Sequence, residues 1–123
     1  MRRHRPVRIL LSTAGGNLSQ RLELFALLNL GLVQSLASGA LGPAEAIQRF
    51  YHADNCLYVQ KHLRKREARA IMSHGAQLPD LFEVLAADEA RREYYHELET
   101  IRSLCLRLLR KKRTRSAVER AAA

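Results

Sequence analysis

LSQRLELFALLNLGLVQSLAS, residues 18–38, is the stretch of sequence that decides the fold. Its apolar side chains recur almost all round a 3.6-residue turn, which predicts a helix that other helices surround. Asn17 or Ser19 can cap its first N–H groups, and Gly39 can close it in the left-handed conformation. Gly31 lies inside it at a cost of about 1 kcal/mol relative to Ala, so we expect another helix to cross closely there.

The last third of the chain predicts a long amphipathic helix, from Asp88 to about Lys112. Its apolar residues recur at steps of 4, 3, 4 and 3, the spacing of one buried face. They are Tyr94, Leu98, Ile101, Cys105 and Leu108. The first turns are acidic and the last turn is basic, which the helix dipole favours at both ends. Residues 113–123 lose the pattern, and we expect a frayed basic tail there.

Shorter helices are expected between these two. Pro43 starts one, because a proline in the first turn loses no hydrogen bond. Asp54 is the expected N-cap of the next helix. Another covers residues 65–74 and ends at Gly75, and Pro79 opens the last of them.

The chain divides into a basic N-terminal arm, residues 1–16, a helical domain, residues 17–112, and the tail. In the arm, Val7, Ile9 and Leu11 alternate weakly, as in a short strand. No second strand is expected to pair with it, so the arm is a short strand or disordered. The sequence therefore predicts an all-α fold, a compact multi-helix bundle with a central apolar first helix and a long amphipathic C-terminal helix.

A membrane location is not expected. Residues 24–44 carry no charge, but polar residues, glycines and Pro43 interrupt them, and a span needs about 20 cleaner apolar residues. The N-terminal arm is followed by too short an apolar run for a secretory signal. Cys56 and Cys105 form no CxxC pair and are expected to be reduced core residues. These features predict a cytoplasmic protein.

Residues typical of metal sites or catalysis occur without a productive pattern. His52, Asp54 and Cys56 are ligand types in one segment, but their spacing is not that of a zinc site. A turn, a helix cap and the core are their expected places. The chain has five His and two Cys, and catalytic Cys–His dyads can be imagined in any protein of this composition. Such pairs therefore do not indicate a catalytic site. We therefore expect no enzyme activity, no metal and no cofactor.

The chain has 21 lysines and arginines against 12 acids, a formal charge of +9, and the two signs are segregated. Residues 80–99 are mainly acidic. Two clusters of cations are the candidate partner-binding residues. They are Arg64, Lys65 and Arg66 in the first, and Arg107, Arg110, Lys111, Lys112, Arg113 and Arg115 in the second. Such clusters can attract an acidic protein, track phosphates or only keep a chain soluble.

The stretch LELFALLNLGLVQSLASGALGPAEAIQRFY (22–51), followed by IMSHGAQLPDL (71–81), resembles an uncharacterised family of short all-helical bacterial proteins. The match runs over roughly residues 22–85 and does not include the basic arms. Its matching positions are Asn29, Leu30, Gly31, Glu45, Ala46, Phe50, His74, Gly75 and Asp80. This chain differs from the family at the family's acidic stretch, because residues 78–80 contain only one acidic residue. The resemblance implies a helical fold and a bacterial origin, and no activity.

An acidic protein surface is the favoured partner of the two basic clusters. The chain has no zinc-finger or RNA-recognition signature, and no aromatic lies within the clusters to stack on bases. A helix-turn-helix over residues 54–75 would turn at Arg64 and Lys65, without the usual glycine. The expected function is a binding module, an immunity or antidote protein or a regulatory adaptor. The alternative is a nucleic-acid-binding accessory protein that uses the basic C-terminal helix, and the oligomeric state stays open.

Overall fold

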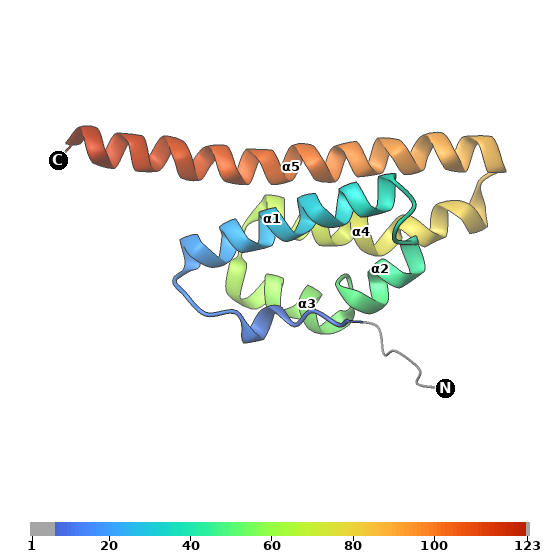
Figure 1. Ribbon diagram of the computed structural model, residues 1–123, viewed down its shortest axis with the longest axis horizontal. Helices are drawn as coiled ribbons and strands as arrows, with labels where there is room; N and C mark the ends of the chain where they lie inside the picture. Colours follow the sequence, from blue (N-terminus) through green and yellow to red (C-terminus); the bar gives the residue numbers. More distant parts are fainter. Residues whose placement is uncertain (1–6, 123) are drawn as a thin grey trace.

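The computed structural model describes the backbone of residues 7–122 and the side chains of residues 7–111. Helices account for most of this part, and no strand occurs between residues 7 and 122 (Figure 1). The elements are the 3-10 turn η1 (Leu11–Thr13), α1 (Leu18–Ala37), α2 (Pro43–Arg49), α3 (Ala53–Tyr58), the π-helical turn η2 (Val59–Leu63), α4 (Arg66–Val84) and α5 (Ala87–Ala122). The predicted all-α fold is confirmed, with α5 continuing past its predicted end near Lys112.

The long helix α5 runs the length of the molecule, and α1 and α4 lie beside it (Figure 1). Both are antiparallel to it. Tyr94, near the start of α5, donates a 3.3 Å hydrogen bond to the carbonyl oxygen of Leu36, near the end of α1. α2 and α3 lie on the side of α1 and α4 away from α5. The N-terminal end of α1 therefore lies toward the C-terminal half of α5, and its C-terminal end toward the α4–α5 connection.

The buried face of α5 is the predicted one. All of its members are at most 8% exposed. They are Tyr94, Leu98, Ile101, Cys105 and Leu108. Because five residues at alternating steps of three and four share one side of a helix, local periodicity alone was enough to locate this face.

Tyr51 occupies the middle of the core and decides how α4 passes it. A Cβ at Gly75 would lie 2.4 Å from Cε1 of Tyr51, so glycine is needed for the helix to pass the ring. The Tyr51 hydroxyl donates a 2.8 Å hydrogen bond to Oδ1 of the buried Asn29. Asn29 in turn donates to the carbonyl oxygen of Phe25 at 2.9 Å. The polar atoms at the centre are thus paired, as burial requires.

α4 is one helix where the sequence predicts two. The predicted end at Gly75 and the predicted start at Pro79 are both wrong, because α4 runs unbroken from Arg66 to Val84. A proline inside a helix costs about 3 kcal/mol. Ile71 and Leu78 are fully buried on either side of Gly75, and burying each contributes about 1.5–3 kcal/mol. Tertiary burial therefore outweighs the local signal to stop.

α1 is buried on one side and not all round. Asn17 caps it as predicted, accepting a 2.9 Å hydrogen bond from the Gln20 N–H. Leu24 is 40% exposed and Leu27 52% exposed, so the expectation of a helix surrounded by others is wrong for this face. A Cβ at Gly31 would meet nothing within 4 Å. The close helix crossing expected there does not occur among the described residues.

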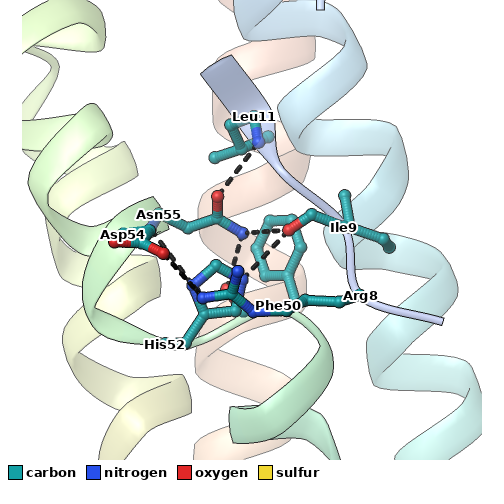
Figure 2. Close-up of polar contacts among 7 residues, drawn as sticks. All are labelled: Arg8, Ile9, Leu11, Phe50, His52, Asp54 and Asn55. Atoms are coloured by element: carbon teal, nitrogen blue, oxygen red, sulfur yellow. Dashed lines mark hydrogen bonds and ion pairs between the residues drawn. The ribbon is translucent and has the colours of Figure 1, made fainter. Parts of the chain in front are cut away.

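The N-terminal segment is fastened to α3 by Asn55 and forms no strand (Figure 2). Asn55 Oδ1 accepts a 3.0 Å hydrogen bond from the Leu11 N–H. Its Nδ2 donates to the carbonyl oxygens of Ile9 at 2.9 Å and Phe50 at 2.8 Å. The strand alternative for residues 7–13 is wrong because the Asn55 side chain and the carbonyl oxygen of Arg49, and not a second strand, hydrogen-bond to this backbone.

His52, and not Asp54, caps α3. Nδ1 of His52 accepts from the Asn55 N–H at 3.4 Å, while Asp54 lies in the first turn of the helix. The Asp54 carboxylate instead accepts a 2.6 Å hydrogen bond from Arg8, and this contact holds the pKa of the carboxyl below its usual range (Figure 2). The predicted N-cap is therefore wrong, although both residues do lie at a turn and a helix start.

Candidate binding surface at the basic end

The two basic clusters predicted from the sequence lie side by side in the structure. Lys111 Nζ donates a 2.7 Å hydrogen bond to Oε1 of Glu67, at the start of α4. This contact joins the segment that carries the first cluster to the part of α5 that carries the second. The basic end is defined here by the residues whose side chains are described. They are Arg64, Lys65, Arg66, Arg107, Arg110 and Lys111.

A tight turn presents the first cluster. Arg64 ends η2 in the left-handed conformation, at φ 47°, and Lys65 is extended before Arg66 begins α4. Left-handed backbone is uncommon for a residue with a Cβ, and here it reverses the chain between η2 and α4. All three side chains are exposed. The glycine usual at such turns is replaced by an arginine, so the turn itself carries charge.

Glu67 is the acid within this group, and its charge is used inside the fold. Only 7% of Glu67 is exposed. The hydrogen bond from Lys111 is the main reason that the pKa of the Glu67 carboxyl lies below its ordinary value, and the positive charge of Arg107 acts in the same direction. Arg64, Lys65, Arg66 and Arg110 are exposed and make no ion pair with other described side chains. These four cations therefore face solvent without an ion-pair partner among the side chains of residues 7–111.

Further cationic and aromatic residues lie at the same end, and sequence reasoning missed them. Arg21, in the first turns of α1, donates a 3.2 Å hydrogen bond to the Tyr58 hydroxyl. The Tyr58 ring packs against His62 in η2, with centroids 4.9 Å apart. No sequence signal joins these residues, because the contact depends on how α1 and η2 pack. An exposed imidazole and a phenol thus border the cations.

The opposite end of the molecule is acidic. Exposed acidic residues lie on the last turns of α4 and the first turns of α5, on either side of the connection at the right of Figure 1. They are Asp80, Glu83, Asp88, Glu89 and Glu93, which define the acidic end. Phe82 and Tyr95 are 49% and 45% exposed among them. The molecule therefore carries opposite charge at its two ends.

Lys112, Arg113 and Arg115, the remaining members of the second cluster, lie on the backbone of α5 but outside the residues whose side chains are described. The backbone continues this helix past the N-terminal end of α1 (Figure 1). That path places the three positions beyond Lys111 along the same helix. That these three residues take part in partner binding stays a prediction.

His52 and Asp54 both contact the Arg8 guanidinium, but the residues weighed for metal binding or catalysis form no ligand cluster in the described part of the chain. His52 contacts the carbonyl oxygen of Ile9, Asp54 pairs with Arg8, and the Cys56 thiol points to the carbonyl oxygen of Tyr51. Over residues 7–111 no group of three His, Cys, Asp or Glu side chains could hold a metal ion. These three residues serve the local structure.

The two thiols are free and poorly suited to act as nucleophiles. Cys105 is fully buried, as predicted, and burial raises its pKa to about 12. Cys56 is half-buried beside the core, and its pKa is also raised by burial. A nucleophilic cysteine reacts as the thiolate, which both environments disfavour at neutral pH.

A small surface pocket of about 230 Å³ lies between η2 and α4. Its lining is Cys56, Val59, Gln60, Arg69, Met72, Ser73 and Ala76. Elsewhere, His74 pairs with Glu97 and joins α4 to α5.

No helix in the described chain is both long enough and apolar enough to cross a membrane.

The arrangement of charged residues is the feature of this structure that bears most directly on function. The observation that stands out is two distant basic clusters meeting across the Glu67–Lys111 contact. Comparisons with known proteins found no matching family model, no matching curated protein and no matching solved structure.

Proposed function

We propose that the chain is a non-catalytic cytoplasmic binding module, an immunity or antidote protein or a regulatory adaptor, whose basic end docks on an acidic surface of a protein partner. The observation that carries the proposal is the meeting of the two basic clusters at one end. Complementary charge steers such encounters and selects between partners. The two free thiols are in keeping with a reducing compartment.

The arrangement of charge supports this proposal beyond the total of +9. The nearby acid, Glu67, is buried in its pair with Lys111, so it does not compete with a partner for the exposed cations. Arginines outnumber lysines in the group, and their planar guanidinium groups can bind carboxylates in a bidentate manner. A mostly arginine surface, formed by the turn before α4, the start of α4 and the facing part of α5, suits a folded acidic partner.

Binding to a polyglutamate peptide, measured by fluorescence anisotropy, tests the proposal. The double variant Arg66→Glu and Arg110→Glu should weaken binding by at least about tenfold, because it reverses two exposed charges at the basic end. The matched control is Arg91→Glu and Arg92→Glu, which makes the same charge change in exposed residues of α5 at the acidic end. Equal losses in the two variants would contradict docking at the basic end.

Nucleic acid is the second candidate, and a specific feature of α4 favours it. The helix follows directly after the turn at Arg64 and Lys65. Its exposed face carries residues that can contact phosphates and base edges. They are Arg66, Arg69, Ser73 and Gln77. This face would have to enter a groove of the duplex while the basic end contacts the backbone.

A DNA duplex in the same anisotropy assay separates the two candidates. Phosphate contacts give a slope of log affinity against log salt of about −0.9 for each phosphate neutralised. Replacing Arg110, Lys112 and Arg113 by Ala, which leaves Lys111 in its pair with Glu67, should flatten that slope by about 3 if each contacts one phosphate. Sub-micromolar duplex binding at physiological salt that this triple substitution abolishes would favour nucleic acid over a protein partner.

A further inference from the structure

One face of α1 is apolar and uncovered. Leu24 is 40% exposed and Leu27 52% exposed, with the half-buried Leu28 beside them. One turn further, Gly31 is exposed, and a Cβ there would meet nothing within 4 Å. Positions 24, 27, 28 and 31 recur at the spacing of one helix face. No other described element covers this face, which we call the free face of α1.

Gly31 adds a second reason to expect an occupant. Glycine in a helix interior destabilises it by roughly 0.5–1 kcal/mol relative to alanine. Glycine is used where a backbone must approach closely, and Gly75 has that role against Tyr51. Gly31 has no such neighbour among the described residues. Its open space in the middle of α1 suits a helix from another molecule.

The segregated charge identifies that molecule and its orientation. The basic end lies toward the N-terminal end of α1, and the acidic end lies toward its C-terminal end. Two copies packed antiparallel along α1 place each basic end beside the acidic end of the other copy. A parallel pair would place like charges together, which is unfavourable.

We propose that the free face of α1 pairs with the same face of a second copy, antiparallel, about a two-fold axis near Leu27 and Leu28. Such an interface is self-complementary, as the closed symmetry of most dimers requires. One helix pair buries less surface than a stable obligate dimer. The dimer is therefore weak and depends on concentration. This inference does not depend on the partner of the basic end.

Sedimentation equilibrium over roughly 10 to 300 μM, the range in which small interfaces associate, tests the dimer. The wild-type chain should show a reversible monomer–dimer equilibrium. Leu27→Lys should remove the dimer. The matched control Leu57→Lys makes the same change at a leucine of α3 that is 50% exposed, and it should leave the dimer intact. A wild-type monomer throughout, or equal effects of the two variants, would overturn the proposal.

Disulfide cross-linking in a Cys56→Ser background tests the orientation. In an antiparallel pair, Leu27→Cys lies near its own mate and should cross-link. Leu24→Cys should not, because the two copies of that position lie about 10 Å apart along the axis, at 1.5 Å per residue. Disulfides need Cα atoms within roughly 7 Å. Equal cross-linking at both positions indicates a parallel pair, and no cross-link at Leu27→Cys removes the axis from this position; either result overturns the proposal.

Discussion

Lys111 of α5 and Glu67 of α4 form a hydrogen-bonded ion pair, 2.7 Å between Nζ and Oε1, in which the carboxylate is buried and the ammonium is exposed. The pair therefore has unequal partners. Removing the lysine leaves a buried charge without its donor, whereas removing the acid frees an exposed cation. Both changes should lower stability, because each breaks the pair, but only the loss of the lysine should also weaken binding at the basic end.

Replacing Lys111 by Met should lower the free energy of unfolding by about 1–3 kcal/mol, because a buried acceptor loses its partner. The matched control is Arg110→Met, since Arg110 is exposed and has no ion pair with a described side chain. It should change stability by less than about 0.5 kcal/mol. Urea unfolding followed by circular dichroism measures both. Similar losses in the two variants would mean that the pair contributes little.

The same pair gives stability a dependence on pH. The pKa of the Glu67 carboxyl is lower in the folded chain than its ordinary value. The carboxylate therefore stabilises the fold fully above the ordinary glutamate pKa, and the contribution disappears as pH falls through the depressed value. The stability difference between the wild-type chain and Glu67→Gln should shrink from about pH 6 to about pH 3. A difference that stays constant or grows over this range would contradict the assignment.

Asn55→Ala should detach the N-terminal segment. The substitution removes three hydrogen bonds, to Leu11, Ile9 and Phe50, at a total of about 3 kcal/mol. Trypsin should then cleave after Arg8 much faster than in the wild-type chain. Asp54→Ala, which removes only the exposed ion pair to Arg8, should leave the urea midpoint near that of the wild type. If Asp54→Ala speeds cleavage equally, the ion pair holds the segment as strongly as Asn55 does, which would contradict the role given to Asn55.

Two Gly→Ala substitutions should have opposite signs. Gly75→Ala forces a Cβ to within 2.4 Å of the Tyr51 ring and should cost about 1–3 kcal/mol. Gly31→Ala meets nothing within 4 Å and should stabilise the monomer by up to about 1 kcal/mol. Thermal unfolding in dilute solution, where the chain is monomeric, measures both. A stabilising Gly75→Ala would show that the ring moves aside freely.

Features that depend only on residues close together in the sequence could be predicted. The buried face of α5 follows from its spacing, the start of α2 from Pro43, and the start of α1 from the Asn17 cap. The predicted break between Gly75 and Pro79 is wrong because Gly75 makes room for the ring of Tyr51, a residue far away in the chain. Sequence rules for glycine and proline consider only residues nearby in the chain, so they cannot account for a contact with that ring.

The candidate site divides in the same way. Both basic clusters are visible in the sequence, because charge is a property of each residue. Their meeting is not visible, since it depends on the packing of α4 against α5 and on the contact between Glu67 and Lys111. Arg21 joins the same end through Tyr58 for a similar reason. Segregated charge is a sequence property, but the surface it forms is a tertiary one.

Pro79 has a consequence for how the molecule opens to solvent. Without an N–H, Pro79 cannot donate to the carbonyl oxygen of Gly75, so the hydrogen-bonded ladder of α4 has a gap at that step. Amide hydrogens after Pro79 should exchange with solvent faster than those of residues 66–75, since the short final segment can unfold alone. The last turn of α4, with Asp80 and Glu83, would then fluctuate as its own cooperative unit while the basic end keeps its protection.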